Sequence, residues 1–355
     1  MKNIEQNKIK IGIIFGGRSC EHEISILSAA SVMDAIDKDR YEIVPIGITK
    51  EGKWFLIKAN MSGITSLADE RIKDIFTDAD PITIADFDEM TDFAFPLLHG
   101  PYGEDGTIQG LFKMLGKPYA GCGVAASAIS MDKIFTKEMW LRAGLPVCKH
   151  RYTTTIECKS SIEKEIENIE SALTYPVFVK PANMGSSVGV SKVENRDELR
   201  EAILNALHYD DRILAEENVS AREFEVALLG NGDADVSVVG EIINDAEYYD
   251  YDSKYKNGET ELIIPAKLPP ELSEEIEKLA KKAYKVLDGE GFSRIDLFFD
   301  EKNGKVYLNE MNTIPGFTKF SMFPLLWESK GCEYSKLIER IIALGYERHN
   351  AENNW

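Results

Sequence analysis

Apolar residues in the first hundred positions form short continuous runs, separated by one stretch of helical spacing. The runs have the length typical of buried strands, and residues 25–36 carry apolar side chains at helical intervals. Strands that alternate with helices predict βαβ units and therefore a parallel sheet. The expected strands are Ile9–Phe15, Tyr41–Ile48 and Asp92–Leu98.

Polar segments follow the first and third of these expected strands. Gly16–Glu23 comes directly after the first strand, and His99–Asp105 comes after the third. Ligands of open α/β sheets collect beyond the carboxyl ends of the strands. We therefore expect both segments to face one crevice.

The remaining chain mixes helical and strand-like patterns. A helix is expected over 125–143, because Gly144 and Pro146 form a normal stop signal. Residues 247–261 are polar and aperiodic, which is typical of a lid loop, and residues 349–355 are expected to fray. Further strands are expected at 175–180, 212–217, 223–229 and 237–243, and further helices at 272–287 and 335–344.

The composition is that of a packed globular protein. The 355 residues exceed the ~250–300 at which single cores stop growing, so two or three domains are expected. No apolar run approaches the roughly 18 residues of a membrane span, and residues 1–8 lack a signal-peptide core, so we expect a cytoplasmic protein. A net charge of −19 disfavours nucleic acid as a partner. Five scattered cysteines without a C-x-x-C pair argue against a disulfide framework and a zinc site.

The most informative pattern lies near the C-terminus, where two strand-like runs carry polar groups two residues apart. Arg294 and Asp296 lie in one run, and Glu310 and Asn312 lie in the other. Side chains at i and i+2 project from the same face of a strand. Carboxylate and amide oxygens suit Mg²⁺, which also binds phosphate oxygens and water. The pattern predicts a nucleotide–metal site, and the alternative is the solvated face of an antiparallel sheet.

A lysine at the end of an expected strand precedes a turn rich in glycine and serine. Lys180 is followed by residues 181–189, whose backbone N–H groups and hydroxyls could surround phosphate oxygens. The turn is not a Walker A loop, because the lysine precedes the glycines. The glycines could instead serve the turn alone. Lys133 could supply a second cation for phosphate, or it is a solvated helix lysine.

Several titratable residues have two interpretations each. Glu216, Glu217 and Glu223 could accept hydrogen bonds from an adenine amino group or ribose hydroxyls, or they are solvated surface groups. His99 could act as a general base or make a structural hydrogen bond. Glu21 could bind an ammonium group or cap the first helix.

Together these residues resemble those of the D-alanine–D-alanine ligases, members of the ATP-grasp superfamily. The similarity runs from about Lys10 to Leu344, and its motifs occur in the family's order. The matching strings are Phe15–Glu21, Leu98–Gly110, Ser130–Lys133, Val179–Pro181 with Gly185–Gly189, Tyr249–Tyr255, Gly291–Asp296 and Asn309–Gly316.

The resemblance implies an α/β ATP-grasp fold in three domains. Residues 1–123 would form a Rossmann-like parallel-sheet domain on the substrate side, and 124–220 and 221–349 would be α+β domains that grip ATP, with a tail at 350–355. The implied activity joins two D-alanine molecules for peptidoglycan precursor synthesis, through a D-alanyl phosphate made from ATP. D-alanine and ATP are the expected partners, two Mg²⁺ ions are the expected cofactors with Mn²⁺ as an alternative, and a homodimer is the expected assembly.

The resemblance also implies roles for individual residues. The expected catalytic set, which includes the lid network and the oxyanion contacts, is Glu21, Ser186, Tyr255, Arg294 and Gly316. The expected substrate contacts are Glu21, His99, Ser321 and Met322. The expected ATP contacts are Lys133, Lys180, Ser187, Glu216, Glu217, Val219, Glu223 and Lys254. The expected metal ligands are Asp296, Glu310 and Asn312.

Some positions bear on specificity. Met184 stands where some relatives carry a carboxylate, and Phe320 where some carry histidine. The pair Lys254 and Tyr255 resembles the branch that uses D-alanine as second substrate. A ligase that uses D-serine is an alternative, because an apolar pocket rejects one extra hydroxyl only weakly. A nucleotide-binding regulator without turnover is the other alternative.

Overall fold

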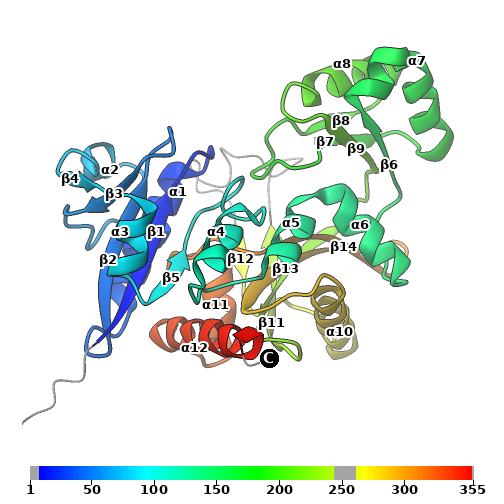
Figure 1. The fold of residues 1–355 in the computed structure, drawn as a ribbon. Helices are drawn as coiled ribbons and strands as arrows, with labels where there is room; N and C mark the ends of the chain where they lie inside the picture. Colours follow the sequence, from blue (N-terminus) through cyan, green and yellow to red (C-terminus); the bar gives the residue numbers. More distant parts are fainter. Residues whose placement is uncertain (1–7, 244–260, 354–355) are drawn as a thin grey trace, which may run out of the picture.

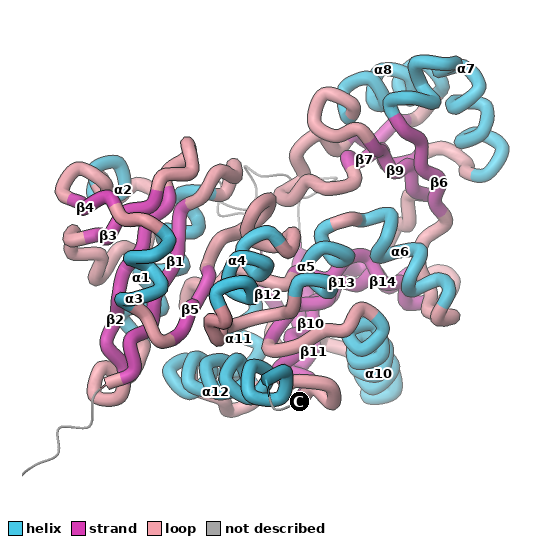
Figure 2. Tube along the Cα trace, in the orientation of Figure 1, coloured by secondary structure: helices cyan, strands magenta, loops and turns pink. Residues whose placement is uncertain are grey.

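The computed structural model describes residues 8–243 and 261–353, which form three β-sheets and the helices around them (Figure 1). In the same orientation, Figure 2 shows the N-terminal sheet on the left, the sheet of the middle of the chain at the upper right, and the C-terminal sheet below. The expected α/β architecture is confirmed. The expected domain boundaries at 123 and 220 stay predictions.

The N-terminal sheet has the strand order β4-β3-β2-β1-β5. Strand β1 lies between β2 and β5 and pairs in parallel with both, which confirms the predicted parallel core, and β3 and β4 extend the sheet with antiparallel pairing. Its strands are β1 (Ile9–Gly16), β2 (Tyr41–Ile48), β3 (Trp54–Ile57), β4 (Ala79–Pro81) and β5 (Phe93–Pro96). Its helices are α1 (His22–Ala35), α2 (Arg71–Asp74), α3 (Ile84–Met90) and α4 (Thr107–Leu115).

The middle sheet has the order β6-β9-β7-β8, and all of its neighbouring strands are antiparallel. The strands expected at 175–180 and 212–217 are both present in it. Two helices pack on it through a buried apolar cluster that includes Ile166 and Leu199. Its elements are β6 (His150–Thr154), α7 (Thr155–Ala172), β7 (Val177–Pro181), β8 (Ser191–Val193), α8 (Arg196–Ala206) and β9 (Arg212–Glu217).

The C-terminal sheet has the order β12-β11-β10-β13-β14, again with antiparallel pairing. On one face of the sheet, Phe224, Val226 and Ile295 pack into a core with residues of three helices, α5, α6 and α10. The intervening residues face the opposite side. Its strands are β10 (Arg222–Leu229), β11 (Asp235–Ile243), β12 (Glu261–Ile263), β13 (Phe292–Asp300) and β14 (Lys305–Asn312). The surrounding helices are α5 (Val124–Met131), α6 (Lys133–Arg142), α10 (Pro270–Val286), α11 (Met322–Ser329) and α12 (Tyr334–Asn353).

The single helix expected over 125–143 is wrong, because the structure has two helices, α5 and α6. The break is at Asp132, whose backbone is extended and whose carboxylate accepts hydrogen bonds from the N–H groups of Ile134 and Phe135. Aspartate in that position caps a new helix by satisfying its free N–H groups. The cap places Lys133 at the first residue of α6.

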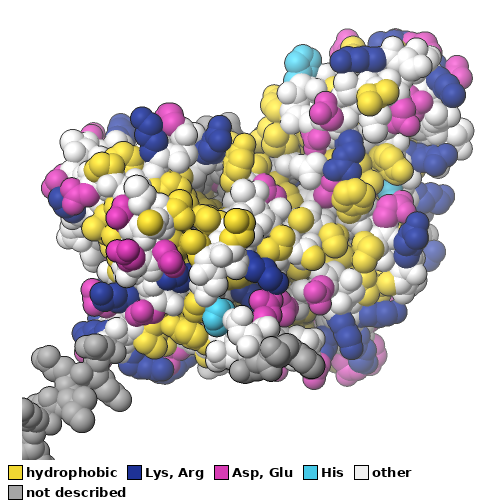
Figure 3. Space-filling model, viewed as in Figure 1, with side chains coloured by type: hydrophobic (Ala, Val, Ile, Leu, Met, Phe, Trp, Pro, Cys, Tyr) yellow, Lys and Arg dark blue, Asp and Glu magenta, His cyan; other side chains and the backbone are white. Residues whose placement is uncertain are grey.

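The frayed end expected from residue 349 is also wrong, since α12 continues to Asn353. Arg348 is buried in its last turns, where its guanidinium donates to the carbonyl groups of Tyr119 and Gly121 and lies over the Tyr119 ring. None of the helices in the described ranges combines the length and apolar composition needed to cross a membrane. The space-filling view shows acidic and basic side chains interspersed over the visible face (Figure 3).

Candidate active site

A cavity of about 930 Å³ lies where the three sheets approach one another. Its lining includes every expected site residue that falls within the described ranges, from Glu21 of the N-terminal part to Met322 of α11. Lys254 and Tyr255 lie outside the described residues, as does most of the expected lid. The structure thus brings the candidates together but does not test their roles.

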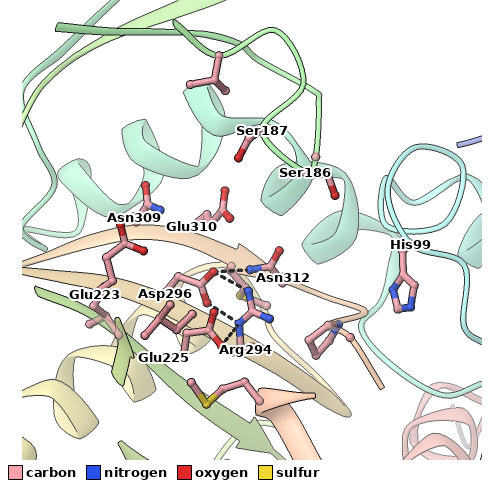
Figure 4. Close-up of a pocket in the computed structure, with 18 of the residues that line it drawn as sticks. His99, Ser186, Ser187, Glu223, Glu225, Arg294, Asp296, Asn309, Glu310 and Asn312 are labelled. Carbon is pink, nitrogen blue, oxygen red and sulfur yellow. Dashed lines mark hydrogen bonds and ion pairs between the residues drawn. The ribbon is translucent and has the colours of Figure 1, made fainter. Parts of the chain in front are cut away.

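The polar face of β13 and β14 forms one wall of this cavity (Figure 4). Arg294 lies opposite Asn312, and Asp296 lies opposite Glu310, in the antiparallel register. The Arg294 guanidinium donates two hydrogen bonds to the Asp296 carboxylate, of 2.6 and 2.7 Å, and Asn312 Nδ2 donates to the same carboxylate at 3.0 Å. The four side chains share a face as the i, i+2 pattern predicts, and they line a cavity together with groups from other elements.

A β-bulge modifies that wall. The register shifts between Asp296 and Leu297, which face Glu310 and Leu308, so Asn309 is an extra residue in β14. A bulge of this kind re-aims side chains beside it. Leu308 therefore stays in the apolar core while Asn309 and Glu310 both line the cavity.

Glu225 is a wall residue that we did not expect from the sequence. It is buried on β10, directly opposite Asp296, and its Oε2 lies 3.0 Å from Arg294 Nε. Burial disfavours the charged guanidinium, but the Asp296 and Glu225 carboxylates outweigh it and raise the pKa of Arg294 well above its usual value. The signal was available, because Glu225 follows Glu223 by two residues on one expected strand.

The donor set of the wall suits a hard cation. Asp296, Glu310 and Asn312 offer carboxylate and amide oxygens, the ligand types that Mg²⁺ takes. Within 8–243 and 261–353, no three His, Cys, Asp or Glu side chains are grouped to hold a metal. The expected set contains only two carboxylates, and its third member is an amide. Asp296 already binds Arg294 through both oxygens, so a metal would use its remaining lone pairs.

A buried charge cluster lies beside the cavity, and two of its members, Glu216 and Lys180, belong to the lining. Glu216 of β9 lies between two lysines, with Lys137 Nζ 2.5 Å from Oε1 and Lys180 Nζ 2.8 Å from Oε2. Burial alone would raise the pKa of the Glu216 carboxyl, but the two ammonium groups overcome it and lower the pKa to about 2. Glu216 is therefore ionised across the physiological range, and it can accept hydrogen bonds but not donate them.

Lys137 is the second residue that sequence reasoning missed. It follows Lys133 by four residues on α6, so the two lysines lie on the same face of the helix. Lys133 Nζ donates to the Met184 carbonyl at 2.8 Å and lies 3.6 Å from Glu310 Oε2. Helix α6 thus places Lys137 beside the Glu216 carboxylate and Lys133 near the Glu310 carboxylate.

The turn between β7 and β8 carries Ser186 and Ser187 over the cavity (Figure 4). Both serines have positive φ values, of 49° and 59°, and lie beside Gly185. Ser186 Oγ donates to Glu21 Oε1 at 2.6 Å, which links this turn to the start of α1. The base of the turn is fixed by Asp210, which accepts from the backbone and side-chain N–H groups of Asn183.

Glu21 and His99 meet at the end of the N-terminal sheet. Glu21 is buried and makes no side-chain cap to α1, so the capping interpretation is not supported. His99 Nδ1 donates to the Ile314 carbonyl at 2.9 Å, and its Nε2 accepts from Ser28 Oγ at 2.9 Å. Burial lowers the pKa of His99 although Glu21 opposes this effect, so the ring is neutral. Both ring nitrogens are occupied, which favours the structural interpretation over a general base.

Glu104 is a third unexpected member of the site, from the same polar segment as His99. Its two carboxylate oxygens accept from the N–H groups of Gly100 at 2.9 Å and Ile314 at 2.8 Å. Burial, followed by the charge of Glu21, raises the pKa of Glu104 to about 8. His99 and Glu104 together hold both backbone polar groups of Ile314, two residues before Gly316.

The remaining candidates line the cavity near α11 and β9. Ser321 Oγ accepts from the Thr318 N–H at 3.1 Å, and a Cβ added at Gly316 would lie 3.2 Å from that oxygen. Met322 is buried against Gly240 of β11. Also in the lining are Ser187, Glu217, Val219 and Glu223.

The fold and the cavity define an ATP-grasp enzyme: two antiparallel units close on a site of lysines and carboxylates, and a parallel-sheet unit stands beside them. Solved structures support this class. The structure of the VanG D-Ala:D-Ser ligase from Enterococcus faecalis has a TM-score of 0.84 at 34% identity, covering 95% of this chain and 99% of that one. The D-alanine-D-alanine ligase from Coxiella burnetii has a TM-score of 0.84 at 33% identity, covering 97% and 96%.

Sequence comparison identifies the family. Models described as the D-ala D-ala ligase N-terminus and C-terminus match residues 10–122 and 139–343. The D-alanine--D-alanine ligase of Geobacillus thermodenitrificans (strain NG80-2) is 46% identical over 352 residues, covering 96% of each chain. The chain belongs to the D-alanine–D-alanine ligase family.

Proposed function

We propose that this chain is an ADP-forming ligase that joins two D-alanine molecules into D-alanyl-D-alanine for peptidoglycan precursor synthesis. Family membership over nearly the whole chain supports the reaction. The observation that carries the proposal is that one cavity is lined both by a lysine and carboxylate cluster and by Glu21, His99 and Ser186. A nucleotide bound at the lysine and carboxylate cluster and an amino acid bound at the Glu21 group would therefore lie in the same cavity.

The nucleotide end is assigned to the buried charge cluster. Ionised Glu216 accepts from the exocyclic amino group of adenine, and Glu223 accepts from ribose hydroxyls. Lys133 and Lys180 neutralise phosphate oxygens, with Ser187 and the backbone of the glycine-rich turn as further donors. Glu217, Val219 and Lys254 complete this end of the site.

The metal site is assigned to the β13 and β14 wall. Asp296, Glu310 and Asn312 would hold two Mg²⁺ ions, or Mn²⁺ in their place, and the metal would neutralise phosphate charge. Arg294, kept charged by Asp296 and Glu225, stabilises the oxyanion of the tetrahedral intermediate that forms when the second amine attacks. The N–H of Gly316 stabilises the same charge.

The amino acid end is assigned to the loops. Glu21 binds the ammonium group of the first D-alanine, and His99 lies close to its carboxylate and orients the Gly316 loop. Ser186 and Tyr255 close the site over the substrates, which excludes water from the acyl phosphate. Ser321 and Met322 contact the second D-alanine.

A homodimer is part of the proposal, and light scattering should report twice the mass of the chain.

Phosphate release from Mg-ATP tests the proposed function. The purified chain is given D-alanine, D-serine or D-lactate, and products are identified by mass. We expect release that depends on D-alanine, with D-alanyl-D-alanine as product. Equal formation of the mixed dipeptide with D-serine would change the second substrate but not the mechanism, and ATP binding without release would support a regulator. Neither alternative is favoured, because the ligase relatives near 46% identity carry the D-alanine name.

A further inference from the structure

Lys137 is a fully buried cation that the proposed reaction leaves without a role. Its side chain is 1% exposed, and the Glu216 side chain that it meets is 2% exposed. Within the described part of the chain, the only charge paired with Lys137 is Glu216, and its Nζ makes no hydrogen bond to any other group. A buried ammonium group is costly unless it is paired with an opposite charge, so the role of Lys137 follows from its pairing with Glu216.

The geometry separates the two lysines of the cluster. Lys180 is 14% exposed and lies at the end of β7, beside the glycine-rich turn, whereas Lys137 lies behind Glu216 on α6. Lys180 lines the cavity and Lys137 does not, so Lys180 is the lysine of this pair that is placed to contact a nucleotide phosphate. The Glu216 carboxylate therefore pairs with both lysines, and of the two only Lys180 is close to the glycine-rich turn.

The charges in this cluster do not cancel. Glu216 carries one negative charge, and Lys137 and Lys180 together carry two positive charges, so the cluster has a net charge of +1. With Lys137 present, Glu216 keeps a counter-charge when Lys180 turns to phosphate. Without Lys137, Lys180 would be the only cation paired with a buried carboxylate, and a phosphate would have to compete for it.

We propose that Lys137 is a positioning residue that neutralises Glu216, and thereby leaves Lys180 available to the phosphates of ATP. This inference rests on the proposed function, because it takes the cavity to be the ATP site. It adds that affinity for ATP depends on a lysine that never touches the nucleotide. The charge of Lys137 matters here, and its hydrogen-bonding capacity does not.

Calorimetric binding of a non-hydrolysable Mg-ATP analogue, without D-alanine, tests this directly. Lys137→Met should raise the Kd at least about tenfold, and Lys137→Gln, which keeps a hydrogen-bond donor but no charge, should do the same. Lys137→Arg should stay within about threefold of the wild type, because the charge is retained. Arg142→Met is the matched control: it removes an exposed cation from the same helix, and the Kd should not change.

A double-mutant cycle with Glu216→Gln separates positioning from a general structural effect. In the Glu216→Gln background, Lys137→Met should change the Kd less than about threefold, because the Glu216 carboxylate that Lys137 neutralises is absent. The double variant should also melt at a higher temperature than Glu216→Gln alone, since that single variant leaves Lys137 buried without a counter-charge. If Lys137→Met does not fold, Lys137→Gln carries the same cycle.

The outcomes distinguish this inference from the proposed function. A wild-type chain that does not bind the analogue contradicts both. A wild type that binds it and releases phosphate with D-alanine, beside a Lys137→Met variant of unchanged Kd, contradicts the Lys137 role alone. Additive effects of Lys137→Met and Glu216→Gln also contradict it. A rise in the KM for ATP with little change in kcat or in the KM for D-alanine supports it.

Discussion

The two ends of the cavity are built in different ways. The wall of Arg294, Asp296, Glu310 and Asn312 belongs to two neighbouring strands, whose pairing register sets the spacing of the side chains. The group of Glu21, His99 and Ser186 comes from loops of separate elements, joined by contacts such as the Ser186 to Glu21 hydrogen bond. We call the first group the strand end and the second group the loop end. Strand pairing fixes the charged side chains of the strand end, whereas the loop end depends on contacts between segments that are distant in the sequence. Substitutions at the strand end should therefore affect the chemical step most, and those at the loop end should affect substrate binding.

Asp296→Asn should give the largest loss. It removes a carboxylate from the proposed metal site and breaks the two-hydrogen-bond pair with Arg294. We expect kcat to fall about 10³-fold with the melting temperature little changed. Asp300→Asn, at the outer end of the same strand, should keep kcat near the wild-type value. A kcat for Asp296→Asn within tenfold of the wild type would remove our metal assignment.

Arg294→Lys should give the next largest effect. Lysine keeps the charge but lacks the planar fork that meets Asp296 and Glu225 together, so we expect kcat to fall about 10²-fold. The control is Arg222→Lys, since Arg222 makes a similar pair with Glu241 on the same sheet but outside the cavity lining. Equal kcat values for the two variants would contradict a special role for Arg294.

Glu21→Gln tests the loop end. It replaces the buried charge that accepts from Ser186 and is proposed to bind an ammonium group, so the KM for D-alanine should rise about tenfold. Glu23→Gln, two residues away in a surface pair with Lys50, should leave that KM unchanged. A change in kcat without a change in the KM for D-alanine would place Glu21 elsewhere in the reaction.

Glu104→Gln should have the smallest effect on turnover but a clear effect on stability. The folded pKa of Glu104, about 8, lies above the ordinary 4.5, so the folded state binds this proton more tightly. Its contribution to the free energy of unfolding therefore falls as pH rises from about 4.5 to 8. The glutamine variant lacks this dependence, and thermal melts across that range should show the wild type losing stability relative to it. Parallel curves would contradict the raised pKa.

The sequence predicted the strand end better than the loop end for a physical reason. Period-two spacing places Arg294 and Asp296 on one face whatever the rest of the fold does. The contacts of Glu104 and His99 with Ile314 join segments more than two hundred residues apart, and no local pattern encodes them. The bulge at Asn309 likewise depends on pairing with β13.

The helical spacing of apolar residues predicted where helix occurs, but it did not predict where one helix ends and the next begins. Apolar spacing over 125–143 correctly indicated helix, yet it did not reveal the Asp132 cap that separates α5 from α6. Lys137 was accessible from its i+4 spacing to Lys133, but an isolated lysine on a helix is usually solvated. Its burial follows from the approach of α6 to β9, which is a tertiary contact.

The central claim is that the two ends act on one carboxyl group, which ATP phosphorylates at the strand end and which the loop end holds. D-alanine labelled with ¹⁸O in both carboxyl oxygens tests it most directly. A carboxylate oxygen of the first D-alanine attacks the γ-phosphorus, and ADP leaves. The amine of the second D-alanine then attacks the carbonyl carbon and loses a proton, and phosphate leaves with the oxygen that it received from the carboxylate. We predict one ¹⁸O in the phosphate released for each D-alanyl-D-alanine formed. Phosphate that contains no ¹⁸O, while dipeptide accumulates, would contradict the account.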